Sequence, residues 1–155
     1  MSLHYDLLLE TERAPADVLD RLAATGAFER VDGALRGPGL TVSAAALSAF
    51  GRSVARDDLE LDAALSVVFD LDGGEARDEA EALALDLALA LAAEAPGDAF
   101  LSYLGDYPVL ARRGGALVLD RGWAEARPAL AVRVESGSDG PVGADDLFGQ
   151  PWATG

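Results

Sequence analysis

The stretch Leu59-Glu-Leu-Asp-Ala-Ala-Leu-Ser-Val-Val-Phe-Asp-Leu71 alternates apolar with polar or small residues more regularly than any other part of the chain. Successive side chains of a β-strand point to opposite faces of a sheet, so this spacing predicts a strand with one buried face. The residues predicted to be buried are Leu59, Leu61, Ala63, Leu65, Val67, Phe69 and Leu71. The opposite face is then acidic and polar, with Asp58, Glu60, Asp62, Asp70 and Asp72.

The N-terminal residues show the same alternation. Leu3, Tyr5, Leu7 and Leu9 fall on one face, and His4, Asp6 and Glu10 fall on the other. This pattern predicts another half-buried strand. Leu8 is the exception, because it places an apolar side chain on the polar face.

Two helices are predicted. Pro15 suits a first helical turn and Gly26 suits the residue after the last, so the first helix is expected from Pro15 to Thr25. The segment Asp72-Gly-Gly-Glu75 has the spacing of a capping box, which introduces a second helix over 75–94 that ends before Pro96-Gly97. The second half of this helix is almost entirely Leu and Ala. It must therefore be buried on nearly all sides or meet a partner, such as a second copy in a homodimer.

Short strands account for most of the remaining pattern. They are predicted at Phe28–Leu35, Leu40–Phe50, Ala99–Leu104, Val109–Arg112 and Ala116–Asp120, and Ala129–Glu135 can add an edge strand. Their connections are short, as at Arg36-Gly-Pro-Gly39 and at the hairpin turn Gly114-Gly115. Short connections favour antiparallel pairing. The predicted fold is α+β, a single antiparallel β-sheet with two α-helices packed on one face, in the order β-α-β-β-β-α-β-β-β.

The predicted domain covers residues 1–135, and residues 136–155 form a linker-like, flexible C-terminal extension. The extension begins with the Gly- and Ser-rich segment Ser136-Gly-Ser-Asp-Gly-Pro-Val-Gly143. Phe148 and Trp152 suggest that its end packs back on the domain.

The composition limits the possible functions. The 155 residues carry a formal net charge of −15, contain no Cys and no Lys, and are 50% apolar. A large negative charge repels phosphates and anionic lipid heads, so nucleic-acid and membrane-surface binding are disfavoured and a basic protein partner is favoured. The N-terminus lacks the basic leader of a signal peptide, and no apolar run approaches the roughly 18 residues of a membrane span. The expected location is the cytoplasm.

Few side chains are available for catalysis. Acid–base and nucleophilic chemistry usually uses His, Cys or Lys, and the chain has only His4, which no Ser or Asp motif accompanies. The prediction is therefore a non-enzymatic protein without a cofactor. The alternative is a carboxylate-based divalent-metal binder or hydrolase centred on Asp70 and Asp72, which lie two residues apart on one predicted strand face.

The acidic row is the candidate partner-binding surface. Like charges on one strand face repel each other, and a cationic partner would relieve that repulsion; a solvated face is the simpler alternative. Trp123 is either part of the core or an interface anchor. The candidate partner-binding residues are Asp57, Asp58, Glu60, Asp62, Asp70 and Trp123.

Several segments resemble the Sit immunity proteins, a bacterial family that protects cells from toxins of swarming-inhibition and related polymorphic systems. They are Leu3-His-Tyr-Asp-Leu-Leu-Leu9, Val67-Val-Phe-Asp-Leu-Asp72 with the Ala/Leu helix that follows, Pro96-Gly-Asp-Ala-Phe-Leu101, and Val109-Leu-Ala-Arg-Arg-Gly-Gly-Ala-Leu-Val-Leu-Asp120 followed by Trp123. The resemblance implies a non-enzymatic protein that neutralises a cognate toxin by binding it. It brings no binding-site motif with it.

Overall fold

The structure is a computed structural model that describes residues 3–26, 28–72, 74, 76–138 and 142–147. In this part of the chain it contains a single nine-stranded sheet and five helices, which confirms the α+β class. The strands are β1 (Leu3–Leu9), β2 (Glu29–Val31), β3 (Ala34–Gly37), β4 (Leu40–Ala46), β5 (Leu65–Leu71), β6 (Ala99–Tyr103), β7 (Tyr107–Arg113), β8 (Ala116–Asp120) and β9 (Val142–Asp145). Phe148 and Trp152 lie outside the described residues.

The sheet is mixed rather than antiparallel. Its strand order is β2-β3-β4-β5-β1-β6-β7-β8-β9, and β9 pairs parallel to β8 while the other neighbours pair antiparallel. A parallel pair needs a crossover, and two helices after β8 provide it: α4 (Arg121–Ala126) and α5 (Pro128–Gly137). The edge strand predicted at Ala129–Glu135 is therefore wrong. Ala131 and Val134 are the buried residues of α5, and their separation of three positions fits a helix.

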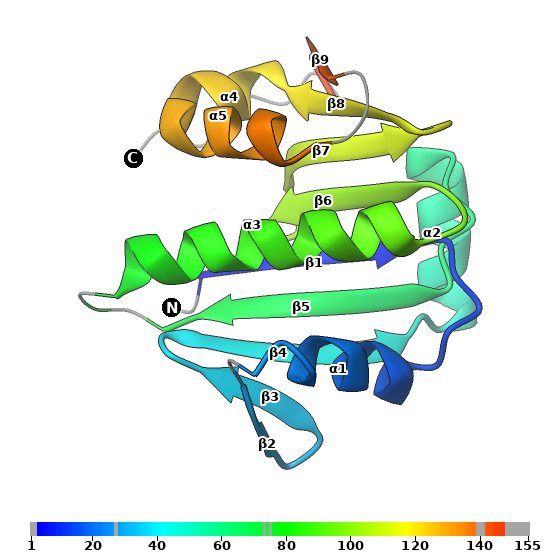
Figure 1. Ribbon diagram of the computed structural model, residues 1–155. Helices are drawn as coiled ribbons and strands as arrows, with labels where there is room; N and C mark the ends of the chain where they lie inside the picture. The colour runs from blue at the N-terminus through cyan, green and yellow to red at the C-terminus, as the bar shows by residue number, and fades with distance from the viewer. Residues whose placement is uncertain (1–2, 27, 73, 75, 139–141, 148–155) are drawn as a thin grey trace.

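Four helices cover one face of the sheet (Figure 1). α3 (Arg77–Glu94) lies across β1 and β5, α1 (Pro15–Ala23) lies over β4, and α4 and α5 lie near β7 and β8. The fifth helix, α2 (Ala49–Leu59), belongs to a separate apolar cluster that includes Phe100 and the partly buried Leu8, on the other face of the sheet. The predicted arrangement of two helices on one face is corrected to four helices on one face and one on the other.

The central pair of strands explains why one face is apolar. In the β1–β5 register Tyr5 lies opposite Phe69 and Leu7 lies opposite Val67, and all four side chains are fully buried beneath the helices. The alternate residues of both strands necessarily point the other way. Trp123 of α4 adds a completely buried ring to the same core, so it is a core residue and offers no surface to a partner.

One side of the apolar half of α3 is buried within the chain. Its Leu85, Leu87 and Leu91 are buried in the main core, and Asp86 forms a two-pronged ion pair with Arg133 of α5 at 2.9 and 2.6 Å. Burial on nearly all sides is not observed, because Ala90 and Ala93 stay exposed and Leu89 is only partly buried. The helix begins after Ala76 without a side-chain cap, so the predicted capping by Asp72 is wrong. No helix in the described residues is long and apolar enough to cross a membrane.

The segment from Leu59 to Leu71 is not one strand, because it contains the end of α2, a loop and then β5. β5 begins at Leu65, and the residues before it end α2 and form a loop. α2 starts at Ser48, whose hydroxyl accepts a hydrogen bond from the Gly51 N–H at 3.0 Å, and ends at Glu60, which takes a left-handed conformation with φ of 53°. The strand predicted from Leu59 to Leu71 is therefore correct only from Leu65 onward.

Glu81 is a buried carboxyl group on α3. Arg127 is its ion-pair partner, with 3.8 Å between Nε and Oε1, and the Glu81 side chain is only 10% exposed. Burial raises the pKa of Glu81, and the attraction of Arg127 and then Arg77 opposes that rise without cancelling it. The ionised form is thus less favourable in the folded chain than in water.

Core and surface aromatic residues should respond differently to truncation. Trp123→Ala is expected to lower the free energy of unfolding by about 3–5 kcal/mol, because it leaves a large cavity. Phe50→Ala is the matched control, since Phe50 is 79% exposed and its loss should change stability by less than about 0.5 kcal/mol. Urea unfolding followed by circular dichroism measures both. Equal losses would contradict the placement of these two rings.

Glu81→Gln should change stability in a pH-dependent way. The pKa of Glu81 is higher in the folded than in the unfolded chain, so its ionised form destabilises the fold at neutral pH and this penalty disappears as the pH falls. The variant is expected to melt higher than the parent chain near pH 7, with the difference shrinking toward about pH 4. A difference in melting temperature that stays constant with pH would show that Glu81 does not titrate as described.

Candidate functional site

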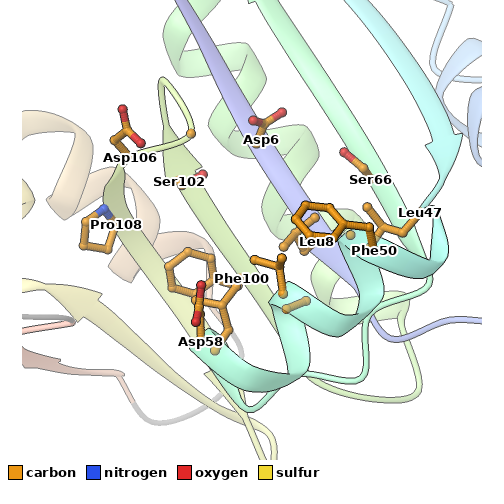
Figure 2. Close-up of a pocket in the computed structure, with 15 residues that line it drawn as sticks. Asp6, Leu8, Leu47, Phe50, Asp58, Ser66, Phe100, Ser102, Asp106 and Pro108 are labelled. Carbon is orange, nitrogen blue, oxygen red and sulfur yellow. The ribbon is translucent and has the colours of Figure 1, made fainter.

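The face of the sheet opposite the four helices contains the candidate site. Here β1, β5 and β6 present the residues that alternate with the core, and α2 covers only part of this face (Figure 2). Between α2 and the strands lies a groove of about 520 Å³, a volume within the range of specific binding pockets. We call it the α2 groove. Its lining residues are Asp6, Leu8, Leu47, Phe50, Gly51, Val54, Ala55, Asp58, Leu59, Ser66, Phe100, Ser102, Gly105, Asp106 and Pro108.

One part of the α2 groove is apolar. Leu8 of β1 and Phe100 of β6 come from the strands, and Phe50 and Val54 come from α2. Phe50 is 79% and Val54 is 39% exposed, which makes them two of the four large apolar side chains that stay exposed among the described residues. Adjacent apolar side chains left in water on one wall of a groove are typical of a surface that a partner can cover.

The other part of the groove is acidic. Asp6, Asp58 and Asp106 line it, and no Arg is among the described residues that do so. Within the described residues, Asp58 and Asp106 form no ion pair. The ion-pair partner of Asp6 is the imidazole of His4, with 3.7 Å between Nε2 of His4 and Oδ2 of Asp6. Burial raises the pKa of Asp6, the charge of His4 opposes that rise, and Asp70 adds to it. The groove therefore holds negative charge that is weakly compensated.

A hydrogen-bonded carboxylate fixes the loop that joins α2 to β5. Oε2 of Glu10 accepts from the Asp62 N–H at 2.8 Å, and Oε1 accepts from the Asp98 N–H at 2.9 Å. Gly97 makes this contact possible, because a Cβ there would lie 2.5 Å from Oε1 of Glu10. The end of β1 is thus tied to the start of β6 and to the residues after α2, which holds the wall of the groove in place.

The predicted acidic row is not a strand face. Asp57 and Asp58 lie in the last turn of α2, Glu60 caps that helix, and Asp62 lies in the loop, where it pairs with Arg56 at 3.2 Å. Residues that alternate along a strand become scattered when the segment is a helix followed by a loop. Of the six predicted partner-binding residues, the structure places only Asp58 in the lining of the groove.

Two other predicted residues lie outside the groove. Asp70 belongs to the same face of the sheet, opposite His4 of β1 and Thr41 of β4. Asp72 follows the end of β5, where its N–H donates to the carbonyl of Gly39 at 2.9 Å. Within the described parts of the chain, no group of three or more His, Cys, Asp or Glu residues is arranged to hold a metal ion.

Sequence reasoning missed most of the groove, including Asp6, Phe50, Phe100 and Asp106. One signal was present: Leu8 interrupts the alternation of β1 with an apolar residue on the polar face. In the structure this leucine packs against the cluster beneath α2. A single apolar residue on an otherwise polar strand face therefore marked the place where that face is partly covered.

Comparison with known proteins identifies the family. The SitI3-like family model matches residues 3–152, which is nearly the whole chain and includes every strand and helix described above. No curated protein and no solved structure matches the chain. The resemblance to Sit immunity proteins is thus confirmed: the chain belongs to the SitI3-like family.

Proposed function

We propose that the chain is an immunity protein that neutralises a cognate bacterial toxin by binding it non-covalently. Membership of the SitI3-like family carries this proposal. The toxin is the partner that an immunity family implies, and the cytoplasm predicted from the sequence is the compartment in which we expect the two to meet. The chain acts by occupying a surface that the toxin needs and does not transform it.

The α2 groove is the part of the structure that best supports such binding. It combines exposed apolar side chains with the carboxylates of Asp58 and Asp106, which form no ion pair in the described part of the chain, and of Asp6, which has His4 as its ion-pair partner. Apolar residues at the centre of an interface and charges around them are the usual arrangement for a tight protein complex. The net charge of −15 further favours a basic toxin, whose approach it would accelerate.

Stoichiometry distinguishes neutralisation by binding from neutralisation by catalysis. The toxin encoded next to this chain's gene is co-expressed with the chain in a sensitive bacterium, and the purified proteins are then titrated against each other in a toxin activity assay. Inhibition is expected to be complete near one equivalent of the chain. Toxin separated from the complex under denaturing conditions and refolded should regain its activity, because binding leaves its covalent structure unchanged.

A non-cognate toxin provides the control and should remain active at the same ratio. Two results would reject the proposal. The first is failure of the chain to protect the bacterium, together with absence of a complex in light scattering. The second is protection at far less than one equivalent, which would mean that the chain modifies the toxin catalytically.

A further inference from the structure

We infer that the α2 groove binds a protruding arginine side chain of the partner together with an apolar neighbour of that arginine. The juxtaposition that supports this is a wall of exposed apolar residues on α2 beside carboxylates from α2, from β1 and from the turn before β7. The inference rests on the proposed function for the identity of the partner. The kind of side chain that is bound is inferred from the residues of the groove alone.

The apolar wall fits the stem of a long cationic side chain. Phe50 and Val54 expose their side chains on α2, while Leu8 and Phe100 lie on the sheet side of the groove (Figure 2). Arginine packs its methylene groups along apolar surface and stacks its planar guanidinium on aromatic rings. An apolar neighbour on the partner would cover what the arginine stem leaves exposed.

The carboxylates fit the head of the same side chain. Asp6 and Asp106 lie at one end of the groove, and Asp58 lies on the helix at another part of its rim (Figure 2). A guanidinium has five N–H donors in a fixed fork, so it can reach more than one carboxylate. Ser66 and Ser102 add hydroxyl groups to the lining. The partner would thereby supply the cation that the groove lacks among its described lining residues.

Other occupants fit less well. A second copy of the chain carries the same charge of −15, so its approach to this groove is opposed by repulsion over the whole surface. A nucleic acid would bring phosphates toward Asp6, Asp58 and Asp106. A basic protein segment with an apolar residue is the occupant that complements both the negative charge and the apolar wall of the groove.

A short peptide tests the chemistry without the toxin. The ¹⁵N-labelled chain is titrated with acetyl-Leu-Arg-Leu-Arg-Leu amide at low salt, and amide shifts are followed by NMR. Saturable shifts are expected at Leu8, Val54 and Phe100. The control peptide carries citrulline in place of arginine, which keeps the shape and removes the charge. Absence of groove shifts, or equal shifts with both peptides, would overturn the inference.

Variants of the groove test it with the toxin. Phe50→Ala is expected to weaken toxin binding at least about tenfold by raising the dissociation rate, as truncation of a central aromatic contact does. Asp58→Asn and Asp106→Asn should each slow association about two- to tenfold at low salt, and less at high salt. The matched controls are Val132→Ala, which truncates a residue of α5 that is 61% exposed, and Glu12→Gln, which removes a charge on an exposed loop.

Asp6→Asn separates a binding role from a structural one. Burial disfavours the charged form of Asp6, so the amide should leave the melting temperature at neutral pH unchanged or higher. Binding should nevertheless weaken, because a guanidinium loses a charged acceptor. Stable protein with reduced toxin binding supports the inference, whereas stable protein with unchanged binding contradicts it.

The two experiments give different answers for the function and for the groove. If the chain binds the toxin and the groove variants match their controls, the immunity proposal stands and the groove inference fails. If the arginine peptide occupies the groove but the toxin does not bind, the groove inference stands and the immunity proposal fails.

Discussion

The pairing of β1 with β5 at the centre of the sheet is the constraint on which the other features depend. Its register places Tyr5 opposite Phe69 and Leu7 opposite Val67 on the helix-covered face. The same register places Asp6 opposite Val68 and Leu8 opposite Ser66 on the other face. A shift of one residue would exchange the two sets. The core and the candidate site are therefore two consequences of one pattern of backbone hydrogen bonds.

The position of α2 depends on a second constraint, at the end of β1. Glu10 directly follows the strand, and its two carboxylate oxygens accept from Asp62 and Asp98. A carboxylate with two backbone N–H donors is held firmly, because charge-assisted hydrogen bonds are stronger than neutral ones. Asp98 in turn accepts from the Gly114 N–H at 2.9 Å through Oδ1, which adds the β7–β8 turn to the same cluster. The groove thus has one wall on a helix whose following loop is tied to three strand ends.

The sequence predicted well the elements that bury one regular face. β1 and β8 were found close to their observed bounds because their apolar residues alternate, and the hairpin turn was found because Gly114 and Gly115 suit the positive φ that it requires. α3 was found from its Ala/Leu run and from the Pro96-Gly97 that follows it. α2 was missed because the residues at its two ends were assigned to the strands predicted on either side of it, although Phe50, Val54 and Ala55 recur at helical spacing. Leu61 and Ala63 then extended the strand pattern by coincidence: both are buried beneath α2, where they contact its cluster from a loop.

The C-terminal part shows a different limit of sequence reasoning. The stretch 129–135 alternates like a strand, but Pro128 is the first residue of α5, which includes this stretch. Only Ala131 and Val134 of that helix are buried. The parallel pairing of β9 with β8 joins segments that are distant in the sequence, and no pattern within Val142–Asp145 predicts it. Asp120 links these segments, since one of its oxygens accepts from the Trp123 N–H and the other from the Leu147 N–H. The sequence contains Asp120 and Trp123, but their spacing does not predict the hydrogen bonds that Asp120 accepts from the N–H groups of Trp123 and Leu147.

Only the negative charge of the candidate site could be predicted from the sequence, and the position of its residues could not. The acidic character of the segment before β5 is real, but the residues that carry it are spread over a helix end, a cap and a loop, and Asp62 is already paired with Arg56. What distinguishes the α2 groove is the combination of weakly compensated carboxylates with apolar side chains on α2 that stay exposed, chiefly Phe50. Phe50 contributes little to the core from its exposed position, and Asp6 is more costly when charged than it would be in water. Features that lower or fail to raise stability persist where binding requires them. These two features of the groove are the ones on which the proposed binding of a partner rests.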